Sequence, residues 1–507
     1  MKKQLLLVLT LAGALSACQS DSAKTSDPTR PNIIYILADD LGYGDISAFN
    51  ENSKINTKHV DQLVAQGIGF SDAHSGSAVC TPTRYGVLTG RYSWRSSLKS
   101  GVTWTLSPHL IDPNRLTVGK LLQEAGYHTA CIGKWHLGFD WKMISEKQAD
   151  YAAPIQNGPN TMGFDYFFGI KASLDIPPYF YIENDRITAS TIDTIDAWDM
   201  TGMEMWRKGA IGDDFKHIEV LPKLTEKATA YINERAETKQ PFFLYFPLPA
   251  PHTPILPTDR FREMSNTNAY GDFVLMVDDV VGQIMQALDN NKLTNNTFIV
   301  FTSDNGCSPR ADFAQLDSLG HHPNYRFRGH KADIYEGGHH VPFAARWPAM
   351  VPAGQRSEQT ICLTDFLRTC AAITRSKLPP NAAEDSYDLL PLLRGEANEE
   401  PLREATVHHS VNGSFAIRQG DWKLIFCPGS GGWSYPRPEQ TKELDLPAVQ
   451  LYNLKKDIGE TENLAEAHPE KVAQLTQLMQ RYVDEGRSTP GAPQSNEGTT
   501  VFQRNTD

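Results

Sequence analysis

A cysteine followed at short spacing by a proline and an arginine is the part of this sequence that most directly suggests chemistry. The run CTPTR starts at Cys80 and leads into TGR at 89–91. Thr81 is a typical helix N-cap and Pro82 suits a first helical position, so we expect a helix to begin here. The unpaired N–H groups at a helix N-terminus favour an anion, which Arg84 would also attract. The motif predicts that Cys80 lies in an anion-binding site at the start of a helix. The alternative is a structural cysteine that precedes a capped helix.

Polar and ionisable residues also follow four short apolar runs, at 32–38, 129–133, 241–248 and 297–303. In order along the chain, they are Asp39 and Asp40, Lys134 and His136, His252, and Asp304 and Asn305. Taken alone, each acidic pair would suit a turn or a helix cap. Three carboxylates in one place, however, require a cation, and oxygen ligands of this kind are those that Ca²⁺ selects.

The four runs have the length and composition of strands that are buried on both faces of a sheet. Helical patterns lie between them, at 59–67, 117–126, 219–235 and 272–291. This alternation predicts an α/β fold with a large mixed, mainly parallel sheet flanked by helices. In such a sheet, ligands bind beyond the carboxyl ends of the strands. Because the polar residues all follow those ends, we expect them to share one rim of the sheet.

A second region is expected to begin near residue 396. Residues 415–426 and 450–457 have the pattern of strands in a smaller sheet, and 471–486 has an apolar stripe at helical spacing. We therefore expect a smaller C-terminal α+β domain that contains an antiparallel sheet. The predicted division is a catalytic domain at 31–395 and a C-terminal subdomain with a polar tail at 396–507.

The first residues are typical of a targeting segment. Lys2 and Lys3 precede an apolar run at 5–15, which is too short to span a membrane. The string LSAC ending at Cys18 resembles a bacterial lipobox, which implies a signal peptide at 1–17, lipidation of Cys18 and a polar tether at 18–30. An ordinary secretory signal that happens to contain a cysteine is the alternative. We expect an exported bacterial lipoprotein in the periplasm or at the outer membrane and cell surface, held by its lipid anchor alone.

The overall charge argues against a nucleic-acid partner. The chain has 48 Lys and Arg residues and 60 Asp and Glu residues, a net charge of −12. A polyanionic substrate would therefore need a local basic pocket. Apart from Cys18 and Cys80, the cysteines have no spacing typical of a metal site, and any disulfide pairing stays open. These are Cys131, Cys307, Cys362, Cys370 and Cys427.

Six motifs between residues 31 and 348 occur in the order typical of one enzyme family. They are DDLGYGD from Asp39, CTPTR from Cys80, GKWHLG from Gly133, PHTP from Pro251, SDNG from Ser303, and RGHK with EGG between Arg328 and Gly338. With them the chain resembles the type I sulfatases, the formylglycine-dependent, arylsulfatase A-like enzymes of the alkaline phosphatase superfamily. The resemblance is specific for the family and does not identify the substrate.

The resemblance implies a modified nucleophile beside a calcium ion. Cys80 would be oxidised to formylglycine (3-oxoalanine) by a formylglycine-generating maturation enzyme, a transient partner. Its hydrate would attack the sulfur atom, with one hydroxyl bound to the metal. The implied ligands of a single Ca²⁺ are Asp39, Asp40, Cys80 in its modified form, Asp304 and Asn305.

The resemblance also assigns roles to the neighbouring cations and histidines. Arg84 and Lys134 would hold the charge of the nucleophile and the sulfate, and Lys331 would bind a sulfate oxygen. His252 would protonate the leaving alcohol. His136 would take the proton of the second hydroxyl, so that sulfate is eliminated and the aldehyde forms again. An unmodified Ser or Cys has no second hydroxyl and would leave an ester that needs separate hydrolysis.

Residues outside the motifs are candidates for a sugar-binding wall. We expect Trp94 to stack on a sugar ring and Arg95 to read a second sulfate, and His321 and His322 lie in an insertion before Lys331. Further candidates are the segment 172–185 with Tyr179, and His217. Core packing is the alternative for any one of the aromatic residues.

The function predicted is the calcium-dependent hydrolysis of sulfate esters on a carbohydrate, a polysaccharide or its oligosaccharides, with a lean towards an algal galactan such as carrageenan. Two alternatives stay open. One is a phosphodiesterase or phosphonate monoester hydrolase of the same superfamily, against which the lysine pair Lys134 and Lys331 argues. The other is a non-catalytic glycan-binding lipoprotein in which Cys80 is unmodified.

Overall fold

The computed structural model describes residues 30–200, 202–396 and 400–503. The predicted signal peptide, Cys18 and all but the last residue of the predicted tether lie outside the described residues. None of the helices in the described part of the chain is long and apolar enough to cross a membrane.

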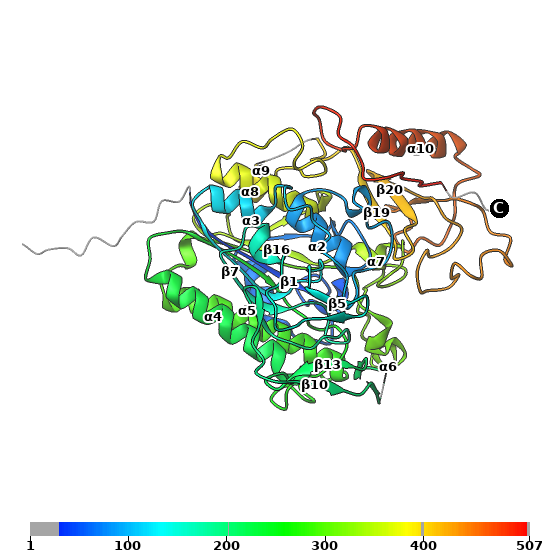
Figure 1. The fold of residues 1–507 in the computed structure, drawn as a ribbon. Helices are drawn as coiled ribbons and strands as arrows, with labels where there is room; N and C mark the ends of the chain where they lie inside the picture. The colour runs from blue at the N-terminus through cyan, green and yellow to red at the C-terminus, as the bar shows by residue number, and fades with distance from the viewer. Residues whose placement is uncertain (1–29, 201, 397–399, 504–507) are drawn as a thin grey trace, which may run out of the picture.

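A 10-stranded sheet forms the centre of the molecule, and its five middle strands run parallel (Figure 1). In spatial order these are β15 (Thr297–Ser303), β1 (Asn32–Ala38), β14 (Phe242–Pro247), β4 (His128–Lys134) and β7 (Tyr166–Ile170). The four apolar runs are therefore strands of this parallel group, as predicted.

Shorter strands complete both edges and make the sheet mixed. Beyond β15 the order is β16 (Phe343–Arg346), β2 (Ile68–Phe70) and β17 (Gln355–Ser357); beyond β7 it is β8 (Ile182–Glu183) and β9 (Arg186–Ile187). The strands β16 and β8 are antiparallel to their inner neighbours.

Helices cover both faces of the sheet, which confirms the predicted α/β class (Figure 1). One face packs against α1 (Lys58–Ala65), α4 (Val220–Ala236) and α5 (Ala269–Asn290), and the other against α2 (Cys80–Thr89), α3 (Val118–Glu124) and α8 (Phe366–Thr374). In β1, Ile34 and Ile36 contact the first layer, whereas Ile33 and Tyr35 contact the second. Because successive side chains of a strand point to opposite faces, a strand covered on both sides must be apolar throughout.

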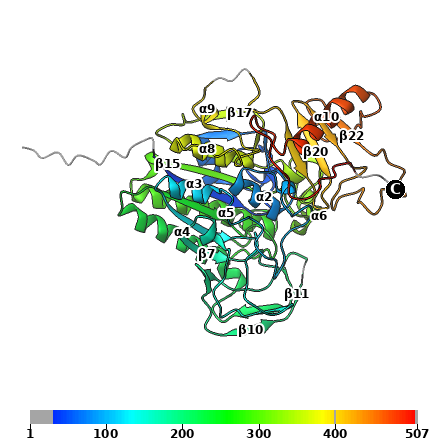
Figure 2. The same cartoon turned by 45° about the horizontal axis from the view of Figure 1, so that its top comes forward.

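The C-terminal region contains a separate antiparallel sheet (Figure 2). Its strands are β19 (Thr406–His409), β20 (Phe415–Gln419), β21 (Trp422–Ile425) and β22 (Gln450–Asn453), and α10 (Pro469–Asp484) packs against it. The apolar pattern predicted the last three strands and the helix. It missed β19, because two of the four residues of that strand are histidines.

Two small strand pairs project from the other end of the sheet (Figure 2). They are β10 (Ile192–Ile195) with β13 (Gly209–Gly212), and β11 (Trp198–Asp199) with β12 (Met205–Trp206). Trp206 stacks between Trp198 and His217, with ring centroids 5.9 and 4.6 Å away. The remaining short strands and α-helices in the described residues are β3 (Ala73–His74) with β18 (Ile361–Cys362), β5 (Met143–Ser145) with β6 (Gln148–Ala149), α6 (Phe313–Ser318), α7 (Glu336–His339) and α9 (Leu390–Leu393).

Candidate active site

The register of the parallel strands brings the two acidic pairs together. Ala38 at the end of β1 pairs with Ser303 at the end of β15, so the next residues, Asp39 and Asp304, leave the sheet side by side. The backbone N–H of Asp40 donates to Asp304 Oδ1 at 3.2 Å, and Asn305 Nδ2 donates to Asp40 Oδ1 at 2.8 Å. The rim expected from the sequence is therefore a single cluster of oxygen-bearing side chains.

Three cations border this cluster, one for each carboxylate. Lys134 Nζ lies 2.6 Å from Asp39 Oδ2, Arg84 Nη2 lies 2.7 Å from Asp304 Oδ2, and Lys331 Nζ lies 2.7 Å from Asp40 Oδ1. All six side chains are buried. Ion pairs are costly to bury, and a group of this size at the end of a sheet indicates a functional site rather than a source of stability.

The carboxylates nevertheless repel one another. Burial and the neighbouring Asp39 raise the pKa of Asp304 to about 7, although Arg84 opposes the change. Burial acts in the same direction on Asp39, but the positive charges of Lys134, His252, Arg84 and Lys331 together outweigh it and hold the pKa of that carboxyl well below its usual range. The repulsion between the two carboxylates therefore favours a further positive charge at this position.

The donor set fits a hard divalent cation. Asp39 Oδ1 and Asn305 Oδ1 are buried oxygens without a hydrogen-bond partner in the described part of the chain. Ligand atoms of Asp39, Asp40 and His252 also lie within 4.8 Å of one another. A metal ion bound by Asp39, Asp40, Asp304 and Asn305 would give both oxygens a partner and relieve the repulsion between the carboxylates.

Cys80 lies at the N-terminus of α2, as expected, but the helix begins at Cys80 itself, two residues earlier than predicted, and its cap differs from the prediction. The N-cap residue is Val79, which has no capping side chain, and Thr81 Oγ1 instead donates to the carbonyl of His136 at 2.9 Å. Cys80 is buried and forms no disulfide. Burial raises the pKa of its thiol, and the positive charges of Lys134 and Lys331 oppose that rise. The thiol is consequently protonated at neutral pH, which makes it a poor nucleophile in this form.

Two histidines have their tautomers set by backbone carbonyls. His136 Nε2 donates to the carbonyl of Thr103 at 3.0 Å, so its Nδ1, which is buried and unpartnered, is a proton acceptor. His252 Nδ1 donates to the carbonyl of Thr253 at 2.5 Å, which leaves Nε2 3.6 Å from Asp40 Oδ2. Burial lowers the pKa of His136 well below the usual value for histidine.

Strained backbone conformations occur at two of these positions. Asp40 and His136 have φ angles of 63° and 55°, in the left-handed region that residues other than glycine seldom adopt. The hydrogen bond from the His136 N–H to the carbonyl of Lys171, 2.7 Å long, helps to hold the second conformation. Such strain persists where the surrounding structure imposes it, typically at functional sites.

A cavity of about 410 Å³ opens beside Cys80 and brings the candidate catalytic side chains together. His136, His252 and Lys331 all line it. Its other ionisable and aromatic lining residues are Trp104, Asp175, Arg207, Arg310 and Trp433. The cavity has room for a single sugar unit and presents both polar groups and aromatic rings to it.

The structure contradicts the predicted roles of Trp94 and Arg95 in substrate recognition. Both side chains are fully buried, and Arg95 Nε pairs with Asp385 Oδ2 at 2.8 Å. Trp94 packs edge-on against Phe415 of the C-terminal sheet, in a core shared by the two regions. They follow Cys80 in the sequence, but α2 carries the chain away from the cavity.

His321 and His322 also lie elsewhere. His321 is buried and bonds Asp45 Oδ1 at 2.8 Å, which ties the insertion to the loop after β1. His322 is exposed and pairs with Asp317 at 2.9 Å. Neither lines the cavity, so the expectation that they form a sugar-binding wall is wrong.

Most residues that line the cavity lie outside the sequence motifs, although the sequence held some signals for them. Asp175 falls inside the segment 172–185 that was singled out, yet the aromatic residue preferred there, Tyr179, is buried. Trp104 and Trp433 are 50% and 41% exposed, which is unusual for tryptophan. Exposure depends on the tertiary structure, so neither residue stood out among the nine tryptophans of the chain.

A second group of histidines lies between the catalytic and C-terminal sheets. His74, His339 and His408 have ring nitrogens within 4.8 Å of one another. Lys423 Nζ donates to His339 Nε2 at 3.1 Å, the Nδ1 atoms of His339 and His74 lie 3.1 Å apart, and His74 Nε2 lies within hydrogen-bonding distance of Asp72 and Arg418. His408 bonds Ser75 and Thr406 through its two nitrogens. Every ring nitrogen has a partner, so this group is a hydrogen-bond network rather than a metal site.

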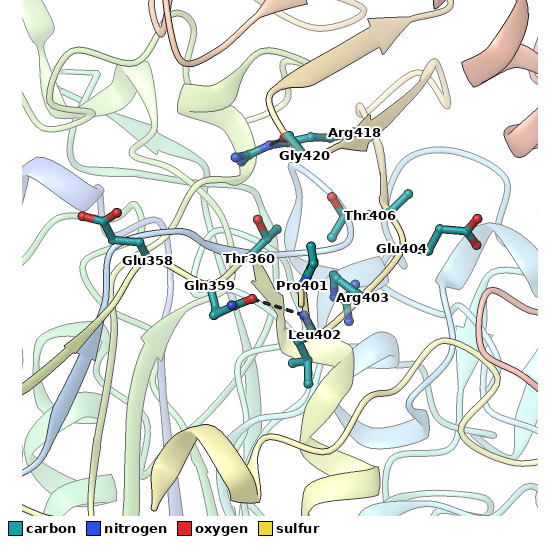
Figure 3. Close-up of a pocket in the computed structure, with 11 residues that line it drawn as sticks. Glu358, Gln359, Thr360, Pro401, Leu402, Arg403, Glu404, Thr406, Arg418 and Gly420 are labelled. Carbon is teal, nitrogen blue, oxygen red and sulfur yellow. Dashed lines mark hydrogen bonds between the residues drawn. The ribbon is translucent and has the colours of Figure 1, made fainter. Parts of the chain in front are cut away.

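A cavity of about 320 Å³ lies against that network (Figure 3). Residues 358–360 and 401–406 form its walls, and the N–H of Leu402 donates to Gln359 Oε1 at 3.2 Å across it. Arg418 and Thr406 line this cavity and also bond the network histidines. It contains none of the residues that the motifs singled out.

Comparison with known proteins identifies the family. The family model described as Sulfatase matches residues 31–376. An N-acetylgalactosamine-6-O-sulfatase of Bacteroides thetaiotaomicron is 34% identical over 511 residues, which cover 93% of this chain and 96% of that protein. The N-acetylgalactosamine-6-sulfatase of Sus scrofa is 30% identical, covering 97% and 91%.

Solved structures agree with this result. A Bacteroides thetaiotaomicron structure, reported in a study of the metabolism of multiple glycosaminoglycans, has a TM-score of 0.79 and 33% identity, covering 89% of this chain and 99% of that one. The crystal structure of Ps i-CgsB in complex with k-i-k-neocarrahexaose has a TM-score of 0.68 and 25% identity, covering 92% and 95%. The rim of acidic and basic side chains around Cys80 thus belongs to an enzyme of the sulfatase family, a sulfuric ester hydrolase of the alkaline phosphatase superfamily.

Proposed function

We propose that the protein removes 6-O-sulfate groups from a sugar of galactose configuration, with a formylglycine derived from Cys80 as nucleophile and Ca²⁺ as metal. The observation that carries the proposed mechanism is the set of buried charges around Cys80. A protonated, unreactive thiol lies beside Lys134 and Lys331, and the adjoining oxygen cluster suits a cation. The hydrate of an aldehyde at this position would place two hydroxyl groups where the thiol now lies.

The chain's own cations prepare this position for a sulfate ester. Lys331 lines the cavity. Lys134 and Arg84 do not line it and instead form ion pairs with Asp39 and Asp304. Fixed positive charges in a dry site stabilise the charge that develops on sulfate oxygens during attack. Asp39, Asp40, Asp304 and Asn305 would hold the Ca²⁺, which would polarise the sulfate and lower the pKa of the attacking hydroxyl.

The two cavity histidines suit the two proton transfers that the reaction needs. In its imidazolium form, with Nδ1 bonded to the carbonyl of Thr253, His252 would donate the Nε2 proton to the sugar oxygen as the bond between that oxygen and sulfur breaks. His136 Nδ1, the unpartnered acceptor, would then take the proton of the second hydroxyl. The C–O bond to the sulfate breaks as the aldehyde C=O forms, so sulfate leaves with the bonding electron pair. Water then hydrates the aldehyde again.

The choice of a 6-O-sulfated galactose-type sugar is supported by the relatives that match nearly the whole chain. Both curated relatives are named for N-acetylgalactosamine 6-sulfate. The resemblance to a protein bound to a carrageenan-type oligosaccharide is more distant, and we keep an algal galactan as the second candidate. A primary 6-O-sulfate projects from its ring, which suits a cavity that admits one sugar unit.

A screen of defined monosulfated sugars tests this proposal. The set contains the 6-O-sulfates of N-acetylgalactosamine, galactose and N-acetylglucosamine, the 4-O-sulfate of N-acetylgalactosamine, and carrageenan oligosaccharides. We expect the highest kcat/KM for the first, measured as sulfate released. A preference for the 4-O-sulfate or for the glucose-configured sugar would contradict the proposed substrate, and desulfation of carrageenan alone would favour the second candidate.

Paired esters separate the sulfatase from the phosphate-ester alternative. We expect 4-nitrophenyl sulfate to be hydrolysed faster than 4-nitrophenyl phosphate or bis(4-nitrophenyl) phosphate. The reverse order would support a phosphodiesterase or phosphonate hydrolase.

We also propose export as a lipoprotein anchored through Cys18. Labelling of the chain with a palmitate analogue in cells tests the anchor, and the label should be lost in Cys18→Ala.

A further inference from the structure

Asp175 and Arg207 lie together on the wall of the same cavity as Cys80 and His252. Asp175 follows β7, one of the parallel strands, whereas Arg207 follows β12 in the projecting hairpin. We propose that this carboxylate–guanidinium pair binds hydroxyl groups of the sugar that carries the scissile sulfate, and so decides which sugar is accepted. The inference rests on the proposed carbohydrate sulfatase function and adds the residues that read the sugar.

The guanidinium of Arg207 is held in one position by several contacts. Its Nη1 lies 2.5 Å from Asp175 Oδ2 and 3.0 Å from the carbonyl of Asp175. Its backbone N–H donates to the same carbonyl at 3.2 Å, and its guanidinium carbon lies 5.2 Å from the ring centre of Trp104. Arg207 is 44% exposed, and Nε and Nη2 make no hydrogen bond within the described part of the chain. An arginine oriented in this way can donate to a ligand without losing further side-chain freedom.

Asp175 presents the complementary group. Its side chain is 9% exposed, and its Oδ1 is a buried atom with no hydrogen-bond partner in the described residues. A buried carboxylate oxygen without a donor is costly, and a ligand hydroxyl would remove that cost. The pair therefore offers one free acceptor beside free donors, which is the pattern that two neighbouring hydroxyl groups of a sugar satisfy.

The charge of the pair favours hydroxyl groups over a second sulfate. The carboxylate of Asp175 cancels the positive charge of Arg207, so the pair has little net attraction for an anion. Trp104 adds an apolar face beside the pair and is half exposed. Its backbone carbonyl accepts a hydrogen bond from Lys171 Nζ at 2.7 Å, which helps to fix its position. A sugar ring has both an apolar face and hydroxyl groups, whereas a simple aryl sulfate has no hydroxyl to donate.

The test compares a sugar sulfate with an aryl sulfate in the full-length enzyme. In Asp175→Ala, we expect kcat/KM for N-acetylgalactosamine 6-sulfate to fall about 100-fold, from the loss of one charged hydrogen bond and the release of Arg207. The loss on 4-nitrophenyl sulfate should be at least about tenfold smaller. The shape-preserving variant Asp175→Asn should show a loss in the same sense, and thermal melting of each variant confirms that it is folded.

A matched control lies one residue away. Lys208 pairs with Asp196 at 2.8 Å on the exposed surface of the same hairpin and does not line the cavity. Lys208→Ala should leave both activities within about twofold of the wild type. Equal losses on the two substrates in both Asp175 variants, or no loss on the sugar sulfate, would overturn the inference.

Substrates that lack one hydroxyl make the test specific. The 3-deoxy or 4-deoxy form of the sugar sulfate should be a poorer substrate for the wild type and should lose this disadvantage in Asp175→Ala. If the loss caused by removing the hydroxyl and the loss caused by Asp175→Ala are additive, a direct contact between that hydroxyl and Asp175 is excluded. A wild type that cleaves the aryl sulfate and no sugar sulfate would refute the proposed function itself, and with it the inference. If the wild type cleaves sugar sulfates but the Asp175 variants show no selective loss on them, the inference is refuted and the proposed function stands.

Discussion

Lys134 Nζ lies 2.6 Å from Asp39 Oδ2, although 95 positions separate the two residues in the sequence. They follow or end strands β4 and β1, which flank β14 in the sheet. The parallel arrangement brings the carboxyl ends of these strands to one rim, and the ion pair holds the lysine close enough for its charge to act on the thiol of Cys80. Charges from distant segments thereby become a single electrostatic environment for one residue.

The mechanism predicts that Cys80 can be replaced by no unmodified side chain. Cys80→Ser should lower kcat by roughly 10³-fold or more, because a single hydroxyl cannot eliminate the sulfate. Thermal melting should change little, since serine is similar in size and α2 keeps its start. Mass spectrometry of the peptide that contains Cys80 should detect the aldehyde in active wild-type enzyme. Active enzyme that carries only the thiol would contradict the mechanism.

The role proposed for His252 predicts a dependence on the leaving group. His252→Ala should reduce kcat about 100-fold on a sugar sulfate, whose alkoxide is a poor leaving group. The reduction on 4-nitrophenyl sulfate should be less than about tenfold, because nitrophenolate leaves without protonation. Rates measured over a series of aryl sulfates should also show a steeper dependence on leaving-group pKa in the variant. Identical losses on all esters would argue against general-acid catalysis.

The oxygen cluster predicts that Ca²⁺ stabilises the fold as well as the activity. Ca²⁺ at 100 times its dissociation constant should add about 2.7 kcal/mol to the free energy of unfolding. A chelator should therefore lower the melting temperature, and added Ca²⁺ should restore it. Asn305→Ala should reduce this shift, whereas Asp317→Asn, an exposed acidic residue paired with His322, should retain it. A melting temperature that is the same with chelator and with added Ca²⁺ would disprove the site.

The burial of Arg95 predicts a defect in stability and not in recognition. Arg95→Ala leaves Asp385 buried without its partner and should lower the free energy of unfolding by about 3–5 kcal/mol. The exposed pair between Lys216 and Glu219 is the control, and Lys216→Ala should cost less than about 1 kcal/mol. KM for sugar sulfates should stay unchanged in both variants. A raised KM in Arg95→Ala would restore the sequence-based expectation that this residue reads the substrate.

The histidine network predicts that the protein loses stability in mild acid. Burial lowers the pKa of His74 to about 4, against about 6.5 in the unfolded chain. Between these values the unfolded state binds a proton that the folded state excludes, so stability falls as the pH drops from about 6.5 to about 4. The groups that face His74 are Asp72, Glu336, His339, His340, His408 and Arg418.

This loss can be measured as the slope of unfolding free energy against pH. One such histidine accounts for about 1.4 kcal/mol for each pH unit in that window. His74→Gln should make the slope shallower, whereas His468→Gln, at an exposed position, should not change it. The same slope in the wild type and in His74→Gln would contradict the prediction.

Much of the active site could be predicted from the sequence because its residues directly follow buried strands. Asp39 and Asp304 each come one residue after an apolar run, and parallel strands place such positions together whatever the loops do. The motif around Cys80 likewise fixes a helix start by local chemistry. The capping detail was wrong because Thr81 has a stronger partner in a distant segment, the carbonyl of His136.

The wall of the cavity could not be predicted in the same way. Trp94 and Trp104 are ten positions apart and chemically identical, yet one is buried against Phe415 and the other is half exposed at the cavity. Which of them faces a ligand depends on how α2 and the C-terminal sheet pack, and no local pattern records that packing. The sequence by itself determined the family, the sheet and the chemistry at its rim. Only the tertiary structure decided which side chains border the cavity, because exposure is a property of contacts between segments that are distant in the chain.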